Sequence, residues 1–236
     1  MFEGEICVIG QALSMAGGIR IDPYGVCTIP GLFAAGVASD MCCAPPMAVC
    51  ANILGSQATG RRAGESAARY TKEQPQPAVD EGEVKRLKAE VYAPLGRQKG
   101  ITEEEVRIKT IKAHPYLDLR NEENLSKAYQ EFRQIEQDAA SLVADDPHEL
   151  AKCLKIRNLL QELQATALAA RERRETRQGH FRHDYPLIDN INWLKWVIVR
   201  GTGDRMETYL EDIPLEKWKY RPEPEMADPL QPRKEG

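Results

Sequence analysis

Ionisable side chains are concentrated in one short stretch of the chain, between residues 173 and 189. Its 17 residues include four arginines, two histidines and three acids, namely Arg173, Arg174, Arg177, Arg182, His180, His183, Glu175, Asp184 and Asp189. Such a cluster can bind an anion, or it can form a paired polar network where a helix ends. We favour the network, because bidentate arginine–carboxylate pairs commonly fix such a turn. A catalytic role for His180, Arg182 or His183 is the less favoured alternative.

A second candidate site lies in an apolar, glycine-rich part of the chain. Segment 31–36 is nearly uncharged and ends in Gly36, and the small-residue segment 55–61 follows after a loop. The loop holds Cys42, Cys43, Pro45 and Pro46. A short buried strand, a loop and a helix with a small-residue start often form a cradle for a large cofactor. N–H groups at such a helix start are free and carry positive dipole, so they suit an electron-rich or anionic oxygen.

Composition argues against several other functions. The net charge of −4 offers no electrostatic basis for nucleic-acid binding. None of the six cysteines lies in a CxxC pair, so no zinc or cluster site is predicted, and buried reduced thiols in the cytoplasm are the simpler interpretation. The longest uncharged run, 41–60, holds two prolines and several polar residues, so no membrane insertion is expected. We therefore expect a cytoplasmic location.

The character of the chain changes near residue 70. Residues 1–70 hold 4 Lys/Arg, 5 Asp/Glu and 10 of the 17 glycines, whereas residues 71–236 hold 28 Lys/Arg and 31 Asp/Glu. The glycine-rich part predicts an α/β segment, and the charged part predicts an all-α domain. The expected organisation is a first domain at 1–72, a helical bundle at 81–200 and an extended arm at 201–236.

In the first domain, short apolar runs alternate with turn residues. Segment 5–9 fits a buried strand. The sequence Asp22-Pro23-Tyr24-Gly25 is a type I turn signature, which predicts a hairpin followed by a buried strand at 32–35. A helix is expected from about Ser56 to Tyr70, with alanines that allow close packing, and a proline-containing linker follows at 73–77.

Helical periodicity and capping signals dominate the second domain. Thr102 and Asp146 each precede a glutamate three positions later, which is the capping-box signature of a helix start. Apolar residues at spacings of three and four line the helix that starts at Asn121. The expected helices cover 81–92, 102–115, 121–142 and 147–174. Short loops between them indicate a three- or four-helix bundle. Trp218 and Tyr220 are candidates to pack the arm.

Two motifs give the chain a resemblance to a known family. The sequence from Gly17-Gly18 to Ala34-Ala35-Gly36, with Gly60-Arg61-Arg62-Ala63-Gly64 after it, resembles the C-terminal part of the flavin domain in the succinate dehydrogenase/fumarate reductase flavoproteins. The motif Arg174-Glu175-Thr176-Arg177…Arg182-His183-Asp184-Tyr185-Pro186…Asp189-Asn190-Ile191-Asn192-Trp193 resembles the signature of the helical domain in the same family. The resemblance covers roughly residues 5 to 200. Segment 55–61 is most similar to the adenylylsulfate reductase branch.

The resemblance implies an FAD-dependent oxidoreductase in which the first domain is part of a Rossmann-like FAD-binding domain. The implied cofactor-binding residues are Gly36, Val37, Gly55, Ser56, Gln57 and Ala58. The first two are implied to lie near the ribityl chain of FAD. The last three are implied to face the flavin pyrimidine oxygen, where the charge of the reduced ring collects.

Three features depart from the family pattern. Val37 stands where many members have a glutamate for the ribityl hydroxyls, although Asp40 is close in sequence. Leu13 and Ile53 stand where the dicarboxylate-reducing members have a histidine and an arginine for the substrate carboxylate. The chain also has no GxGxxG motif for the ADP half of FAD. We therefore expect neither succinate dehydrogenase nor fumarate reductase activity, and we assign no catalytic acid or base.

The resemblance also implies two partners. We expect the chain to be the C-terminal portion of a flavoprotein, from a split gene or a truncated reading frame, that needs an N-terminal flavin-binding segment or subunit. An iron–sulfur, ferredoxin-like subunit is expected to exchange electrons with it. The alternative is a non-catalytic helical assembly module that uses its arginine-rich motif for docking. A neighbouring reading frame with a GxGxxG motif would favour the enzyme.

Overall fold

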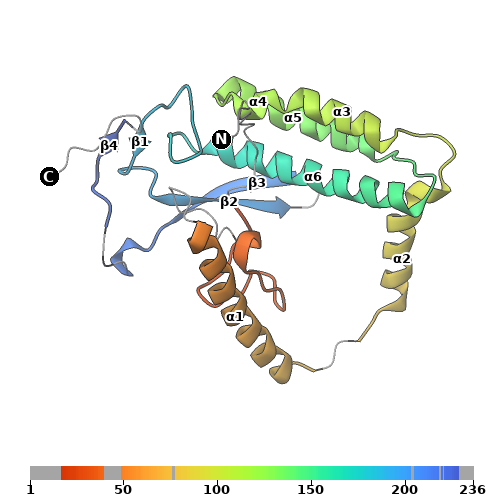
Figure 1. The fold of residues 1–236 in the computed structure, drawn as a ribbon, viewed down its shortest axis with the longest axis horizontal. Helices are drawn as coiled ribbons and strands as arrows, with labels where there is room; N and C mark the ends of the chain where they lie inside the picture. The colour runs from red at the N-terminus through yellow and green to blue at the C-terminus, as the bar shows by residue number, and fades with distance from the viewer. Residues whose placement is uncertain are drawn as a thin grey trace, which may run out of the picture. The chain divides into compact units, whose positions relative to one another are not determined.

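The computed structural model describes residues 17–39, 49–75, 78–202, 205–217, 219 and 221–228 (Figure 1). The chain divides into two compact units, Met1–Ala78 and Val79–Gly236. Several sequence-based expectations lie outside the described residues. They concern the strand at 5–9, Leu13, Asp40, the loop with Cys42, Cys43, Pro45 and Pro46, and the packing of Trp218 and Tyr220.

The first unit contains a turn built around Asp22. Its carboxylate accepts the backbone N–H of Val26 at 2.9 Å, and its carbonyl accepts the N–H of Gly25 at 3.1 Å. Gly25 has a φ of +78°, a conformation that glycine adopts without a side-chain clash. A bridge between Ile21 and Cys27 closes the two arms. The predicted hairpin is therefore confirmed.

The buried strand predicted at 32–35 is wrong. Among the described residues this segment makes only an isolated bridge, from Phe33 to Val26, and Leu32 is 38% exposed. Cys27 donates its N–H to the Leu32 carbonyl at 3.0 Å, but the pairing does not continue as a ladder. The short apolar run forms a packed loop that turns through η1 (Gly36–Ala38).

Helix α1 (Val49–Glu73) packs against this loop. A Cβ atom at Gly25 would lie 2.6 Å from the Cβ atom of Ala63, so the contact needs a glycine on the loop and a small residue on the helix. The rings of Phe33 and Tyr70 meet edge to face, with centroids 5.9 Å apart. The close packing that the alanines predict is thus observed.

The helices of the second unit begin at the residues that the capping signals indicate. Asp80, Thr102, Asn121 and Asp146 are the N-caps, and the side chain of each accepts a backbone N–H of the following turn. Thr102 and Glu105 form a complete capping box. The elements are α2 (Glu81–Tyr92), η2 (Ala93–Gly96), α3 (Glu103–Ala113), α4 (Pro115–Asp118), α5 (Glu122–Ala139) and α6 (Pro147–Glu172).

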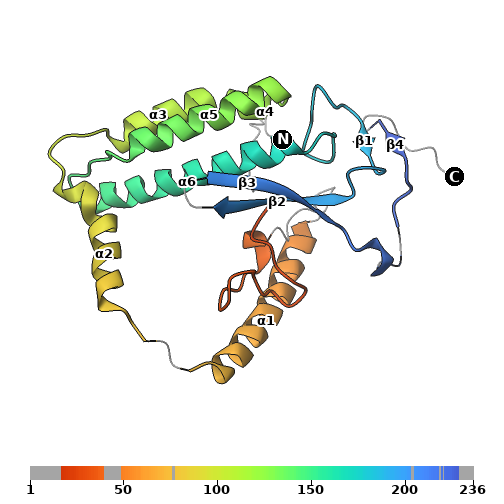
Figure 2. The same cartoon turned by 180° about the vertical axis from the view of Figure 1, so that it is seen from behind.

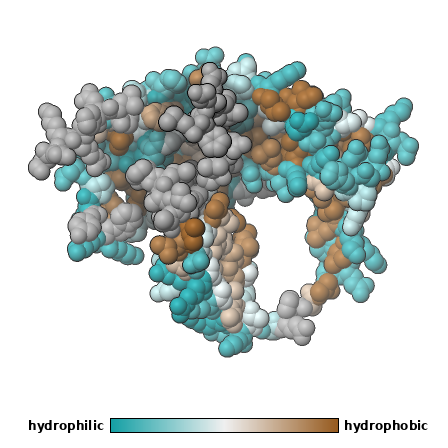
Figure 3. All heavy atoms as spheres, viewed as in Figure 1, coloured by the Kyte–Doolittle hydropathy of each residue, from teal (hydrophilic) through white to brown (hydrophobic). Residues whose placement is uncertain are grey.

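The core of the second unit lies between α3, α5 and α6. Val106 of α3, Leu125 and Phe132 of α5, and Leu160 of α6 have no exposed surface. These positions follow the predicted three- and four-residue spacing, so the helical bundle is confirmed. Helix α2 buries none of its residues, and Figure 3 shows apolar surface along it.

Two small antiparallel sheets follow the bundle. Strands β2 (Lys195–Thr202) and β3 (Arg205–Asp212) form a hairpin with Val197 opposite Leu210, and this hairpin lies beside α6 (Figure 2). Strand β1 (Ile188–Asp189) pairs with β4 (Met226–Ala227), and η3 (Leu215–Lys217) lies between β3 and β4 in the chain.

The hairpin differs from the extended arm that we predict from Gly201 onward. The run Val197–Val199 is β-branched and pairs with residues 208–210, which combine threonine, tyrosine and leucine. Such residues favour a half-buried pleated surface, and they outweigh the polar character of the surrounding sequence. Within the described ranges, none of the helices combines the length and the apolar character that a membrane crossing requires.

Candidate functional site

The arginine-rich motif is organised around the carboxylate of Glu175, which is completely buried. Arg173 donates to it at 2.5 Å, and Arg177 donates through two nitrogens at 2.8 and 2.9 Å. The backbone N–H of Asp189 donates to the second carboxylate oxygen at 2.9 Å. The carboxylate therefore joins the end of α6 to β1, across fourteen residues of chain.

A second buried centre is the guanidinium of Arg182, whose residue is 1% exposed. Its Nη1 donates to the carbonyls of Ala170 and Arg171 at 2.9 Å each, and to the carbonyl of Arg173 at 3.2 Å. Its Nε and Nη2 donate to the two oxygens of Asp184 at 2.8 Å. The last carbonyls of a helix have no partner within the helix, so Arg182 satisfies the C-terminal end of α6.

Thr176 holds the loop at 176–187 in a compact conformation through three hydrogen bonds. Its hydroxyl accepts the N–H of Arg182 at 2.9 Å and donates to the carbonyl of Tyr185 at 2.9 Å. Its own N–H donates to the carbonyl of Leu187 at 2.9 Å. Three separate peptide groups thus converge on one buried threonine.

His180 lies between three arginines, and its hydrogen bonds define its tautomer. Arg120 can only donate, so Nδ1 of His180 accepts from it at 2.8 Å, and Nε2 carries the proton that goes to the carbonyl of Arg173 at 3.1 Å. Burial, together with the charges of Arg120, Arg173 and Arg182, lowers the pKa of His180 to about 4, although the hydrogen bond to the Arg173 carbonyl acts to raise it. His180 is therefore neutral at physiological pH.

The pKa values of two carboxylates of the motif, Asp184 and Asp189, are lowered. The hydrogen bonds from Arg182, together with the N–H of Glu122, outweigh burial and lower the pKa of Asp184 to about 2. Burial acts to raise the pKa of Asp189, but hydrogen bonds from Asn192 and from the N–H of Ile191 outweigh it and lower the pKa.

The geometry supports a paired structural network. Among the described residues no buried side-chain nitrogen or oxygen lacks a hydrogen-bond partner. Both ring nitrogens of His180 are occupied, and Arg182 is bound to helix carbonyls and a carboxylate. Neither residue is free to transfer a proton or bind a substrate. His183 is exposed and donates its backbone N–H to the Arg120 carbonyl.

Sequence reasoning missed two members of this network. Arg120 and Glu122 lie outside the motif and contribute through a side chain and a backbone N–H. Asn190, which belongs to the motif, accepts a hydrogen bond from Arg177 at 2.8 Å. Arg120 is sixty residues away from His180 in the chain. Only the antiparallel return of α6 beside α5 brings them together, so no local signal identifies the pair.

The structure brings two residues of the second candidate site into contact. Gly36 has a φ of +62°, and a Cβ atom there would lie 3.0 Å from the hydroxyl oxygen of Ser56. The N–H of Gly36 donates to the hydroxyl of Thr59 at 3.0 Å. Thr59 in turn donates to the carbonyl of Gly55 at 2.6 Å. Loop and helix are thus joined at this point.

The remaining members of this site lie on accessible surface. Val37, Gln57 and Ala58 are exposed. Because α1 begins at Val49, the predicted helix start at Ser56 is wrong, and the N–H groups of residues 56–58 lie inside the helix. The free N–H groups of a helix start belong to its first turn, so this part of the cofactor argument does not apply to these residues.

FAD fits these residues only in part. Gly36 allows a close backbone approach, and the Ser56 hydroxyl and the Gln57 amide are polar groups beside or near it. The N–H of Gly36 is already bound to Thr59, and among the described residues of the first unit the strand bridges are isolated ones. A dinucleotide needs a continuous sheet with a glycine-rich turn for its ADP half. The described residues therefore fit one edge of a flavin site.

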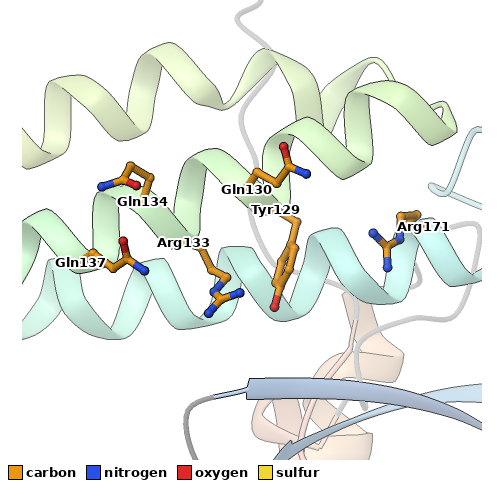
Figure 4. Close-up of a pocket in the computed structure, with 6 residues that line it drawn as sticks. All are labelled: Tyr129, Gln130, Arg133, Gln134, Gln137 and Arg171. Carbon is orange, nitrogen blue, oxygen red and sulfur yellow. The ribbon is translucent and has the colours of Figure 1, made fainter.

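A shallow polar groove of about 390 Å³ lies on α5 and α6 (Figure 4). It is lined by Tyr129, Gln130, Arg133, Gln134, Gln137 and Arg171. It contains no carboxylate, thiol or imidazole. The groove therefore offers neither a nucleophile nor a proton carrier of these kinds.

Comparison with known proteins identifies the family. The family profile described as "Fumarate reductase flavoprotein C-term" matches residues 93–227, which include the bundle and the whole arginine-rich network. The chain belongs to this flavoprotein family. The predicted resemblance is confirmed.

Individual relatives agree with this assignment. The fumarate reductase flavoprotein subunit of Mycobacterium tuberculosis is 28% identical and is matched over 80% of this chain. The Sdh1 complex of Mycobacterium smegmatis in the apo form has a chain that is 26% identical, with a TM-score of 0.71 over 84% of this chain. The adenylylsulfate reductase of Archaeoglobus fulgidus is 22% identical, with a TM-score of 0.62 over 72% of this chain, and shows the shared fold. This chain spans about a third of their length, 35%, 35% and 30% respectively.

Replacing Arg182 with leucine should destabilise the second unit strongly. The change removes the side-chain donor for the Ala170 and Arg171 carbonyls of α6 and one donor for the Arg173 carbonyl, and it removes the arginine partner of the Asp184 carboxylate. We expect a loss of about 3–5 kcal/mol in the free energy of unfolding, measured by urea denaturation. Arg174→Leu, at an exposed position of the same motif, is the matched control and should stay within about 0.5 kcal/mol of wild type. Equal effects of the two changes would contradict the network.

The stability of the second unit should fall between pH 6.5 and 4. In this window the unfolded chain protonates His180 and the folded chain, with a pKa of about 4, does not. Stability is therefore full above the unfolded pKa and decreases by up to about 3 kcal/mol as the pH falls. His180→Asn should remove this component, whereas His114→Asn, at an exposed histidine, should not. Asp184 contributes to the pH dependence of stability only at lower pH, between its ordinary pKa and its folded-state pKa of about 2. A wild-type profile identical to that of His180→Asn would refute the assignment.

Proposed function

We propose that this chain acts as the C-terminal portion of an FAD-dependent oxidoreductase. The observation that carries the proposal is the family match over residues 93–227, together with the similarity to the Sdh1 chain at a TM-score of 0.71. The second unit supplies a self-contained helical domain closed by a buried polar network. The first unit supplies the contact between a glycine loop and a helix.

In this proposal the chain holds the ring end of FAD. Gly36 and Val37 approach the ribityl chain, and Gly55, Ser56, Gln57 and Ala58 present the helix surface beside it. The positive φ of Gly36 and the close Ser56 hydroxyl support this arrangement. When bound, the flavin supplies the hydride or addition chemistry. The residues of this chain orient the ring and provide polar groups around it.

The proposal assigns two partners to the chain. The relatives are about three times as long as the matched region, which supports the need for an N-terminal flavin-binding segment or subunit. An iron–sulfur subunit is the proposed electron-transfer partner. The alternative is a non-catalytic assembly module, and the complete core of the second unit makes that alternative physically feasible.

We assign the specificity to the adenylylsulfate reductase type rather than to succinate or fumarate. Ile53 of α1 is 58% exposed and offers an alkyl side chain where the dicarboxylate enzymes use an arginine. An alkyl group cannot donate the bidentate hydrogen bonds that fix a carboxylate. The 28% identity to a fumarate reductase flavoprotein subunit supports membership of the family, but it does not supply the arginine that is missing at position 53.

The decisive experiment purifies the chain alone and together with the GxGxxG-containing polypeptide encoded beside it. We expect flavin absorbance only in the pair, with reoxidation of the reduced flavin by adenylylsulfate and not by fumarate. Stoichiometric FAD in the chain alone would contradict the need for a partner. Rapid reoxidation by fumarate would contradict the specificity, and the lack of any such reading frame would favour the assembly module.

Two glycine variants test the residue assignment. Gly36→Ala should release flavin from the pair, because a Cβ atom at φ +62° is strained and meets the Ser56 hydroxyl at 3.0 Å. Gly60→Ala is the matched control, since a Cβ atom there has no neighbour within 4 Å. Equal flavin retention in both variants would contradict the assignment of Gly36 to the flavin site.

A further inference from the structure

Thr59 of α1 is a buried polar residue that lies outside the proposed set of flavin-binding residues. The residue is only 8% exposed, although Ala58 and Gly60 on either side of it are exposed. A threonine within a helix commonly turns its hydroxyl towards the carbonyl four residues earlier. Thr59 follows this pattern, since its hydroxyl donates to the Gly55 carbonyl at 2.6 Å and lies 3.4 Å from that of Ser56. The hydroxyl proton is therefore used within the helix.

The oxygen of the Thr59 hydroxyl accepts a hydrogen bond from the glycine loop. The backbone N–H of Gly36 donates to it at 3.0 Å, across 23 residues of chain. Because the hydroxyl proton points to the helix, the oxygen presents a lone pair to the loop, and the two roles are compatible. The carbonyl of Gly36 accepts from the N–H of Ser39 at 3.0 Å and from its hydroxyl at 3.1 Å. Both backbone polar groups of Gly36 are thus paired within the first unit.

These contacts fix a residue that is otherwise free to adopt many conformations. Gly36 has a φ of +62°, and glycine populates positive and negative φ about equally, so its identity alone does not select this conformation. The bond to Thr59 holds the N–H, and the Ser56 hydroxyl lies 3.0 Å from where a Cβ atom of Gly36 would be. Helix α1 therefore sets the conformation of the loop at the residue that the proposed function places beside FAD.

We propose that Thr59 is a positioning residue of the flavin site, which holds Gly36 and Val37 in the conformation that meets the ribityl chain of FAD. This inference rests on the proposed function. Thr59 does not reach the cofactor itself, because it is buried and its hydroxyl is bound to Gly36 and Gly55. It acts by preorganisation, since a loop that is held before the ligand arrives loses less conformational freedom when the ligand binds.

The test removes the Thr59 hydroxyl while keeping the shape of the side chain. Thr59→Val leaves the Gly36 N–H without its acceptor, whereas Thr59→Ser keeps the hydroxyl. Thr71→Val is the matched control, because the Thr71 hydroxyl makes the same kind of bond within α1, to the Ala67 carbonyl at 2.8 Å, and binds no loop among the described residues.

FAD affinity is measured by visible absorbance titration of the full chain paired with the GxGxxG-containing polypeptide encoded beside it. We expect Thr59→Val to bind FAD about tenfold more weakly than wild type, since a buried donor loses its acceptor. Thr59→Ser and Thr71→Val should stay within about twofold of wild type.

Amide hydrogen exchange of the full chain without FAD reports the positioning directly. The Gly36 N–H should exchange about tenfold or more faster in Thr59→Val than in wild type, Thr59→Ser and Thr71→Val. The amides around Ala63, which is buried in the same helix, should stay protected in every form. Loss of that protection in Thr59→Val would show a general loosening of α1 and would overturn the positioning role.

The two measurements separate this inference from the proposed function. Faster exchange at Gly36 together with selectively weaker FAD binding by Thr59→Val supports the positioning role. Equal FAD binding by Thr59→Val and Thr71→Val overturns it, and so does weaker binding while Gly36 remains protected. A Thr59→Ser variant that binds FAD as weakly as Thr59→Val also overturns it. A wild-type pair that binds no FAD contradicts the proposed function itself, and the inference falls with it.

Discussion

The second unit depends on how a long buried helix ends. Helix α6 carries much of the core, and its last carbonyls must find donors before the chain can turn back. Arg182 reaches back along the sequence and supplies them, while its remaining nitrogens bind Asp184. A buried guanidinium is costly to desolvate, so the arrangement is stable only because every donor has an acceptor. Loss of Arg182 would leave the buried carbonyl of Ala170 without this donor.

This requirement extends to segments far from the helix end. Glu175 joins α6 to β1, and β1 pairs with β4, so the chain after the hairpin is tied to the same centre. Arg120, between α4 and α5, binds His180, and the N–H of Glu122, the first residue of α5, binds Asp184. The network therefore connects the start of α5, the end of α6 and strand β1 to one loop, and it leaves the apolar side chains of that loop at the surface.

Local signals in the sequence predict most of the helices. The cap residues Asp80, Thr102, Asn121 and Asp146 are short-range features, and α2, α3, α5 and α6 start directly after them. The β2–β3 hairpin is not predicted, because its short β-branched run lies among polar residues in the sequence, and its packing beside α6 is a tertiary feature. The prediction of a strand at 32–35 is wrong, because an apolar run that has no continuous partner strand cannot form a ladder. Sequence reasoning identifies the arginine-rich motif as a paired network, but the partners in the chain at 120–122 depend on tertiary structure.

Amide hydrogen exchange tests the central claim, that this network is a rigid part of the core, most directly. The N–H groups of Thr176, Arg182 and Asp189 lie in a loop but are hydrogen-bonded to buried groups. The account predicts that they exchange as slowly as those of Leu125 and Phe132 in the core of α5. Exchange as fast as in α2, which buries no residue, would contradict it.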